Sequence, residues 1–405
     1  MEEPLASPLS NPNLPHLPSS SSHSFGNGRL EMVTNNTMTI QQMVRDAHTQ
    51  QASDIHIRVG EVPRFRVRGQ ILVYQKGEIV TPQDFEAYLM ELLTPSQRSR
   101  FLETKELDTG IFYPGFVRCR VNCFETLTGG AMVLRLINLE VPSIESLRLP
   151  AVLKDIVSQK QGLVLVTGAT NSGKTTTIAA MIRFLNENFQ KHIVTIEDPI
   201  EYVHTSRKSL VTQREVGLHT QAYHDALRSV LREDPDVIII GEIRDRLTID
   251  TAIKAAQTGH LVIGTLHTKN SLVAIDRLLS QYHPEEQAMM RVQIVDTLVA
   301  VITQQLVPST DGRRVAALEI LLNNPTMQDY LLKGEDKAIW QLMESSTHEG
   351  MQLMNYALCA LMRSGKISIE EAINASPDVA DLRRRTRNDA INPLPITQRA
   401  ICREV

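Results

Sequence analysis

The chain has 405 residues, 42 lysines and arginines against 46 aspartates and glutamates, and a hydrophobic share of 42%. These values are typical of a globular protein of two or three domains, and the net charge of −4 supplies no broad attraction to nucleic acid. No stretch approaches the ~20 consecutive apolar residues of a membrane span. The four cysteines are too few and too scattered for a disulfide framework or a zinc site, so we expect reduced thiols and a cytoplasmic protein.

The first part of the chain predicts a disordered tail and then a small α+β domain. Residues 1–36 are rich in serine, proline and asparagine and lack apolar periodicity. Residues 37–140 open with an amphipathic helix, "TMTIQQMVRDAHTQQA", and contain a second helix at "PQDFEAYLMELL". Alternating apolar residues predict strands at "DIHIRVG", "PRFRVRG", "QILVYQ", "FVRCRVNCFE" and "AMVLRLI".

After a linker at residues 141–150, short apolar runs alternate with helical stretches over residues 151–323. The runs are "LVLVTG", "HIVTIED", "VIIIGE" and "LVIGTL". Continuous apolar strands separated by helices predict an α/β domain with a parallel sheet that is covered on both faces. The sequence pattern predicts helices over residues 324–386 and a flexible tail over residues 387–405.

The segment "GATNSGKT", Gly168–Thr175, has the Walker A spacing. It follows a predicted strand and opens a predicted helix, which is the context that the motif requires. Its glycines allow a tight loop whose backbone N–H groups face a phosphate, so we expect this loop to bind ATP. Lys174 would neutralise the β- and γ-phosphates, and the Thr175 hydroxyl would bind Mg²⁺. The expected nucleotide-binding residues are Gly168, Ala169, Thr170, Asn171, Ser172, Gly173, Lys174, Thr175 and Thr176.

Acidic residues follow two other apolar runs, Glu197 after "IVTI" and Glu242 after "VIIIG". The carboxyl ends of parallel strands meet at one edge of a sheet, so both acids should lie near the phosphate-binding loop. Such acids are often only helix caps, but hydrolysis needs a second carboxylate beside the phosphates and a group that orients water. We expect Glu242 to hold the Mg²⁺ shell through water and Glu197 to polarise the attacking water, although these two roles could be exchanged.

Two histidines flank the apolar run in "GHLVIGTLHT", residues 259–268. The run is short and β-branched, which favours a strand, and seven extended residues separate the histidines by roughly 23 Å. His260 and His267 therefore cannot share a metal. His267 falls at the phosphate-binding edge and is a candidate γ-phosphate sensor, whereas His260 falls at the far end and is expected to be structural.

Four segments together resemble the boxes of the secretion ATPase superfamily, which serves type II and type IV secretion and type IV pili. They are "GATNSGKTTT", "TIEDPIEYVH", "LREDPDVIIIGEIRD" and "TGHLVIGTLHT". Within that superfamily, "ASDIHIRVG", "VRCRVNCF", "HEGMQLMNYAL" and "GKISIEEAI" are most similar to the PilT-type pilus retraction ATPases. The resemblance implies a PAS-like N-terminal domain, a RecA-like P-loop core and a helical C-terminal region.

The resemblance also implies a cytoplasmic homohexameric motor that uses ATP and Mg²⁺. It would act on an integral membrane platform protein at the inner membrane and thereby retract type IV pili in twitching motility. Arginines of the small domain reach the γ-phosphate in such rings, and Arg118, Arg120 and Arg135 stand on the two matching strands here. From the residues alone, these arginines could equally form a solvated basic face.

Several alternatives stay open at this stage. "TMQDYLLKG" stands at residues 326–334, where retraction ATPases commonly have a different motif, so an accessory pilus ATPase or a type IV secretion ATPase remains possible. The absence of paired CxxC motifs argues against the pilus assembly branch. A RecA-type nucleic-acid motor is disfavoured because the chain has 4% aromatic residues and one tryptophan, Trp340.

Overall fold

The computed structural model describes residues 38–113, 115–137 and 140–391. The predicted tail at residues 1–36 lies outside this range, as do residues 392–405 of the predicted C-terminal tail. The last described helix ends at Ile391, five residues beyond the predicted end of the helical region at residue 386. Among the described helices, none combines the length and the apolar character needed to cross a bilayer.

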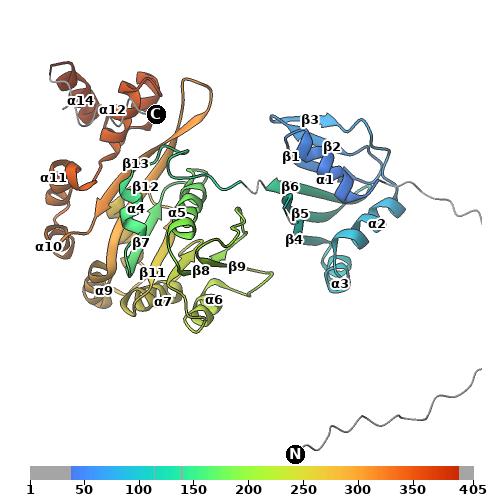
Figure 1. The fold of residues 1–405 in the computed structure, drawn as a ribbon, viewed down its shortest axis with the longest axis horizontal. Helices are drawn as coiled ribbons and strands as arrows, with labels where there is room; N and C mark the ends of the chain where they lie inside the picture. The colour runs from blue at the N-terminus through green and yellow to red at the C-terminus, as the bar shows by residue number, and fades with distance from the viewer. Residues whose placement is uncertain (1–37, 114, 138–139, 392–405) are drawn as a thin grey trace, which may run out of the picture. The chain divides into compact units, whose positions relative to one another are not determined.

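The N-terminal part is a six-stranded antiparallel sheet with strand order β3-β2-β1-β6-β5-β4 (Figure 1). The strands are β1 (Ala52–Arg58), β2 (Arg64–Val67), β3 (Gln70–Val73), β4 (Glu106–Tyr113), β5 (Val117–Thr126) and β6 (Gly129–Ile137). Its helices are α1 (Ile40–Thr49), α2 (Pro82–Leu92) and α3 (Pro95–Thr104). Helix α1 buries Ile40, Met43, Val44 and Ala47, which follow the spacing of one helical face.

The central part is a seven-stranded sheet with order β13-β12-β7-β11-β10-β8-β9. Its strands are β7 (Gly162–Thr167), β8 (His192–Glu197), β9 (Leu210–Glu215), β10 (Val237–Ile240), β11 (Leu261–Leu266), β12 (Leu298–Pro308) and β13 (Arg314–Leu322). All neighbouring strands are parallel except the β12–β13 pair. The carboxyl ends of β7, β8, β10 and β11 therefore meet at one edge of the sheet.

Helices cover both faces of this sheet, and the strand side chains alternate between the two layers. Leu163 and Leu165 of β7 join the core under α6–α9, whereas Val164 and Val166 join the core under α4 and α5. This arrangement explains why the strands read as continuous apolar runs. The bounds of these helices are α4 (Val152–Val157), α5 (Lys174–Asn188), α6 (Tyr223–Val230), α7 (Arg246–Gln257), α8 (Ser271–Leu279) and α9 (Pro284–Thr297).

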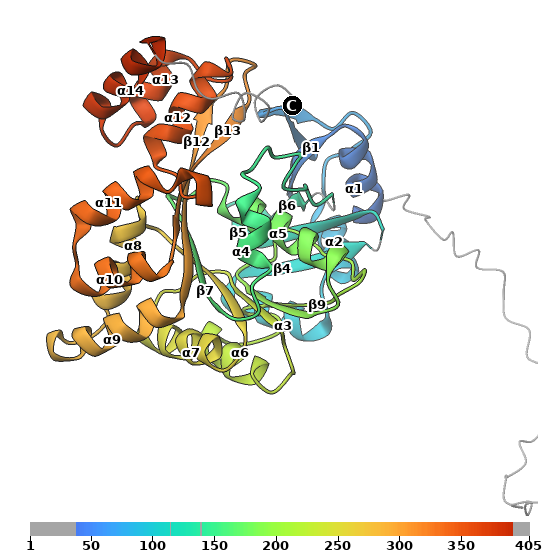
Figure 2. The same ribbon diagram turned by 60° about the vertical axis from the view of Figure 1, so that its left-hand side comes forward.

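The C-terminal part is helical, as the sequence predicted. It consists of α10 (Pro325–Lys333), α11 (Asp336–Ser345), the short 3-10 helix η1 (Thr347–Glu349), α12 (Met354–Arg363), α13 (Ile369–Ala375) and α14 (Val379–Ile391). Helices α12–α14 lie beside the long β12–β13 ribbon (Figure 2), and Leu358, Ile367 and Leu382 share a small core with Val307 of β12. The central parallel sheet, the smaller α+β part before it and the helices after it form the architecture predicted from the sequence, a RecA-like core with an α+β domain before it and helices after it.

Candidate nucleotide-binding site

The phosphate-binding loop connects the last residue of β7, Thr167, to the first residue of α5, Lys174. Gly168 has a φ of +141° and Gly173 a φ of +87°, conformations that residues with a Cβ rarely adopt. Helix α5 has no side-chain cap at its N-terminus. The first N–H groups of a helix lack partners within the helix, so those of α5 are available to bind a phosphate.

Two residues of strand β12, Gln304 and Thr303, hold this loop by hydrogen bonds. The side-chain amide of Gln304 donates to the backbone oxygen of Ser172 at 2.9 Å, and its oxygen accepts from the Thr177 hydroxyl at 2.7 Å. The hydroxyls of Thr167 and Thr303 are hydrogen-bonded at 2.8 Å. These buried contacts fix both ends of the loop.

Lys174 lies inside the loop that it is expected to serve. Its Nζ donates to the carbonyl oxygens of Gly168 at 2.8 Å and Ala169 at 3.0 Å, and lies 3.4 Å from Nδ1 of His267. Burial lowers the pKa of Lys174, and the negative charges of Glu242 and Glu201 oppose that shift. The hydroxyl of Ser172 is buried without a hydrogen-bond partner, as expected for a polar group that binds a ligand.

Glu242 and His267 come together at the carboxyl ends of β10 and β11. The Oε1 atom of Glu242 lies 3.5 Å from Nε2 of His267, and its Oε2 atom accepts from Arg244 at 2.7 Å. The hydrogen bond from Arg244 is the largest cause of the lowered pKa of Glu242, so this carboxyl is ionised at neutral pH. His267 therefore bridges the Lys174 ammonium and the Glu242 carboxylate.

Glu197 occupies the end of β8 in a more enclosed setting. Its carboxylate accepts hydrogen bonds from the Thr195 hydroxyl at 2.6 Å and the Gln213 amide at 3.0 Å. Burial raises the pKa of Glu197 despite these hydrogen bonds. A carboxyl with a raised pKa and fixed orientation suits a general base.

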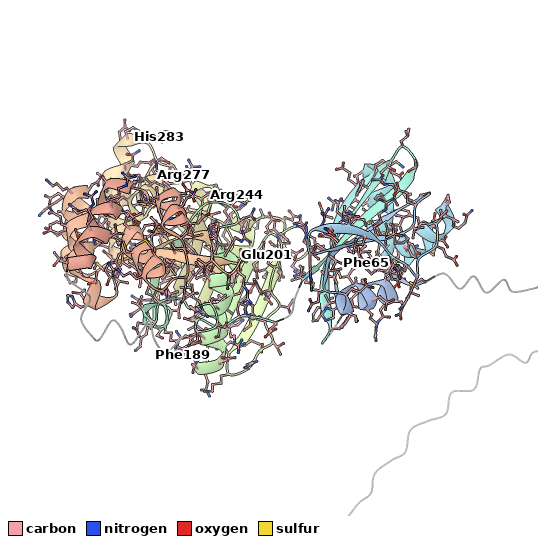
Figure 3. The ribbon with its side chains drawn as sticks, turned by 90° about the horizontal axis from the view of Figure 1, so that it is seen from above. Phe65, Phe189, Glu201, Arg244, Arg277 and His283 are labelled. Carbon is pink, nitrogen blue, oxygen red and sulfur yellow. The ribbon has the colours of Figure 1, made fainter. Side chains whose placement is uncertain are left out.

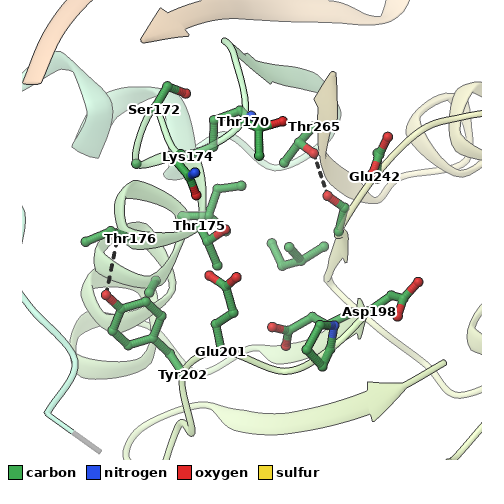
Figure 4. A pocket seen from close by; sticks show the side chains of 18 of the residues that line it. Thr170, Ser172, Lys174, Thr175, Thr176, Asp198, Glu201, Tyr202, Glu242 and Thr265 are labelled. Atoms are coloured by element: carbon green, nitrogen blue, oxygen red, sulfur yellow. Dashed lines mark hydrogen bonds between the residues drawn. The ribbon is translucent and has the colours of Figure 1, made fainter. Parts of the chain in front are cut away.

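These groups line one cavity of about 540 Å³ (Figure 4). Of the residues predicted from the sequence, it contains Thr170, Asn171, Ser172, Gly173, Lys174, Thr175, Thr176, Glu197, Glu242 and His267. Gly168 and Ala169 do not line it; they line a second cavity, and their carbonyl oxygens accept hydrogen bonds from Lys174.

Sequence reasoning missed several residues of the cavity wall. Glu201 extends toward Thr175 in Figure 4, and both Glu201 and Arg244 are labelled in Figure 3. Tyr202 contributes its hydroxyl, 3.1 Å from the Thr176 hydroxyl. Glu201 and Tyr202 stand within "TIEDPIEYVH", so their position three to four residues beyond Asp198 was the available signal.

The donors present fit a magnesium ion. The Thr175 hydroxyl and the ionised Glu242 carboxylate both line the cavity and supply the hard oxygen ligands that Mg²⁺ prefers. The described residues include no group of three or more histidine, cysteine or acidic side chains that could hold a metal. That finding is compatible with Mg²⁺, which commonly uses one or two protein ligands together with waters and substrate phosphates.

The three arginines predicted from the sequence have different surroundings. Arg118 is buried and forms an ion pair with Glu215, and it also donates to the Ile200 carbonyl at 3.2 Å. Arg120 and Arg135 are directly opposite each other on β5 and β6 and are exposed. Arg120 lies 4.0 Å from Asp108, and Arg135 lies 2.8 Å from Asp54. None of the three lines the cavity described above.

The two histidines of "GHLVIGTLHT" lie at opposite ends of β11. The Nδ1 atom of His260 lies 2.9 Å from the Ala255 carbonyl oxygen at the end of α7. His260 does not line the nucleotide cavity, whereas His267 does.

Comparison with known proteins identifies the family. Residues 33–393 match the family described as "Type II/IV secretion system protein", which is most of the chain. The chain belongs to this secretion ATPase family. The resemblance seen in the four sequence boxes is therefore confirmed.

Relatives within the secretion ATPase family are strongly similar. The type IV pilus ATPase PilU of Pseudomonas aeruginosa is 38% identical over 347 residues, covering 85% of this chain and 91% of PilU. The type IV pilus retraction ATPase PilT of the same organism is 40% identical over 335 residues, covering 83% of this chain and 97% of PilT.

Solved structures agree with these sequence relatives. The crystal structure of the pilus retraction motor PilT with bound ADP has a TM-score of 0.80 and 38% identity, and the match covers 86% of this chain and 99% of that chain. The ATPase DotB of Legionella pneumophila has a TM-score of 0.68 and 31% identity over 83% of this chain and 95% of that chain.

Proposed function

We propose that this protein is a Mg²⁺-dependent ATPase motor that powers type IV pilus retraction. The observation that carries the proposal is the convergence of Lys174, Glu242 and His267, at 3.4 and 3.5 Å, beside the phosphate-binding loop. The relatives named PilT and PilU support the pilus role, and the PilT structure with bound ADP supports the nucleotide.

The chain's own residues support a definite division of labour in hydrolysis. The N-terminus of α5 and Lys174 bind the phosphates of ATP, which hold negative charge that helix N–H groups and an ammonium stabilise. The carboxylate of Glu197 accepts a proton from the attacking water and orients it toward the γ-phosphorus. Thr175 and Glu242 would hold Mg²⁺, which neutralises phosphate charge when bound.

His267 is placed to respond to the γ-phosphate. A neutral imidazole donates from only one ring nitrogen, and here the two nitrogens face Lys174 and Glu242. Binding of a phosphate next to Lys174 offers His267 a new acceptor, and hydrolysis removes it. We propose that this exchange transmits the nucleotide state to β11.

Arg120 and Arg135 are proposed to neutralise transition-state charge. Two guanidinium groups directly opposite each other on adjacent strands repel, and Asp108 and Asp54 offset that repulsion in part. Their exposure leaves them available to a phosphate, and a guanidinium in that role can contribute greatly to phosphoryl transfer. Arg118 is less suited, because its side chain is buried against Glu215, whereas those of Arg120 and Arg135 are exposed.

The assembly, location and partner follow from the same proposal. We infer a homohexamer located in the cytoplasm, at the inner membrane, where it acts on the integral membrane platform protein of the pilus machine. The second candidate is an accessory pilus ATPase, because the chain also matches PilU, which is named a type IV pilus ATPase without reference to retraction. A type IV secretion ATPase is the third candidate.

The test combines purified protein with cells. Full-length protein with ATP and Mg²⁺ should form hexamers and release phosphate, and Lys174→Ala should abolish the release. Deletion in the source organism should leave abundant but immotile pili if the protein is the retraction motor. Normal pilus numbers with reduced force indicate the accessory role, and a secretion defect indicates the third candidate. A monomer without ATP hydrolysis would overturn the proposal.

A further inference from the structure

Glu319 is a buried carboxyl group that the catalytic machinery does not use. It lies on β13, is 3% exposed, and has no ion-pair partner among the described residues. Burial raises the pKa of Glu319. An isolated carboxyl is costly to bury, so its hydrogen bonds carry structural or functional weight.

The hydrogen bonds of Glu319 end on the residue that begins α8. Its Oε1 atom accepts from the backbone N–H of Ser271 at 2.9 Å and from the Ser271 hydroxyl at 2.7 Å. Asn270 caps the same helix by accepting from the Val273 N–H at 2.8 Å. The loop from His267 to Asn270 is therefore attached to β11 at one end and, through Ser271, to Glu319 at the other.

Glu319 also belongs to a row of residues that leads to the phosphate-binding loop. Glu319 is directly opposite Thr303 in the β12–β13 pair, and Thr303 is directly opposite Thr167 in the β7–β12 pair. The Thr167 and Thr303 hydroxyls are hydrogen-bonded at 2.8 Å. The three residues lie side by side on the neighbouring strands β13, β12 and β7, and Thr167 is the last residue of β7 before Gly168.

Glu319 does not line the nucleotide cavity. It lines a separate cavity of about 1130 Å³ between the sheet and the C-terminal helices, with Lys269, Asn270 and Trp340 in the same wall. Gly168 and Ala169 of the phosphate-binding loop line the same cavity. Glu319 can therefore act on phosphate chemistry only indirectly, either through the loop that it holds at Ser271 or through the row that ends at Thr167. That loop carries His267, which lies 3.4 Å from Lys174.

We propose that Glu319 is a positioning residue for ATP hydrolysis, which holds the His267–Asn270 loop in register with the phosphate-binding loop. The proposal rests on the ATPase function proposed above. Removing the carboxyl releases the Ser271 end of the loop and moves His267, while the phosphate-binding loop keeps its contacts with Gln304. A displacement of about 1 Å in such a site can lower the rate by about 100-fold.

The first test separates turnover from binding. We expect Glu319→Ala to lower kcat by about tenfold to 100-fold, with the KM for ATP and the affinity for ADP changed by less than about twofold. Glu319→Gln keeps a carbonyl oxygen that accepts the Ser271 N–H, so its kcat should stay within about threefold of wild type. Equal losses in kcat and in ADP affinity for Glu319→Ala would overturn the proposal.

The second test is a double-mutant cycle with His267→Ala. If Glu319 acts through His267, Glu319→Ala should reduce kcat by less than about twofold when His267 is already absent. Multiplicative losses would indicate a general structural effect and would also overturn the proposal. Thermal unfolding and hexamer size are measured for every variant. If Glu319→Ala does not fold, Glu319→Asp replaces it in the same cycle. The aspartate side chain is one methylene group shorter, so its carboxylate lies farther from Ser271.

The outcome distinguishes this inference from the proposed function. A wild-type protein that does not hydrolyse ATP refutes the ATPase function itself. An active wild type whose Glu319→Ala variant turns over ATP normally refutes only the role of Glu319.

Discussion

Gly168→Ala is the substitution whose effect follows most directly from the geometry of the phosphate-binding loop. A Cβ at Gly168 would lie 2.2 Å from the backbone oxygen of Gln304 and 2.6 Å from the Ser172 hydroxyl, whereas ordinary contact begins at 3.4 Å. The Gln304 oxygen belongs to a buried strand and cannot move aside as a flexible side chain would. The loop must therefore shift by roughly 1 Å, and overpacking of this kind costs about 1–3 kcal/mol of folding free energy.

Gly259→Ala is the matched control for this prediction. Gly259 also has a positive φ, +104°, but a Cβ there would meet nothing within 4 Å. It should show only the backbone cost of about 1–2 kcal/mol and no change in nucleotide affinity. Gly168→Ala should in addition lose one or two hydrogen bonds to charged phosphate, which weakens ADP binding by about tenfold to 100-fold.

Denaturant unfolding and ADP titration, followed by calorimetry or a fluorescent ADP analogue, measure both quantities. The reasoning about the loop would be refuted by a Gly168→Ala variant that binds ADP like wild type and is no less stable than Gly259→Ala.

Three further predictions concern the site and its surroundings. Glu197→Gln should keep the affinity for ADP and lower the rate of phosphate release by about 100-fold or more, because the amide cannot accept the proton of the attacking water. An unchanged rate of phosphate release would show that Glu197 is not the general base. Arg120→Gln and Arg135→Gln should each lower turnover at least about tenfold; turnover equal to wild type would leave them as a surface basic pair. Arg120→Gln should change stability by less than about 1 kcal/mol because its ion pair with Asp108 is exposed, whereas Arg135→Gln should cost more because its partner Asp54 is buried. Burial lowers the pKa of His204 to about 4, so the unfolded chain binds more protons below its ordinary pKa near 6.5. Stability should therefore fall as the pH drops from about 6.5 toward 4, and His204→Gln should reduce that fall in urea unfolding curves recorded at several pH values; identical pH dependence in the variant would contradict this assignment.

Much of the sheet was predictable from the sequence because its strands are buried on both faces. The runs "LVLVT", "HIVTIE", "VIII" and "LVIGTL" correspond to β7, β8, β10 and β11, and their common edge follows from parallel pairing alone. The strands β4, β9, β12 and β13 were not among those predicted from the sequence. Strand β9, "LVTQRE", is only partly buried at the sheet edge, and the burial of β4 alternates around charged and small residues.

The site was predictable where a residue ends a strand, as Glu197 does, or follows it directly, as His267 does. Glu201 and Tyr202 were not assigned because they lie in the irregular segment after β8, whose course depends on tertiary contacts such as the Gln213 bond to the Tyr202 carbonyl at 2.8 Å. The row from Thr167 to Glu319 joins residues 152 positions apart in the chain. It could not be predicted, because it depends on the order of β7, β12 and β13 in the sheet and on the register of their pairing.

Trp340 gives the C-terminal helices their own optical signal. It is the only tryptophan among the 405 residues, it lies on α11, and its partly buried indole lines the cavity that contains Glu319. Intrinsic emission excited at the tryptophan band therefore comes from one place, with no background from the sheet or the N-terminal part. If that emission changes when ATP replaces ADP, stopped-flow fluorescence would measure when the conformation around α11 changes within a single turnover, without any attached dye.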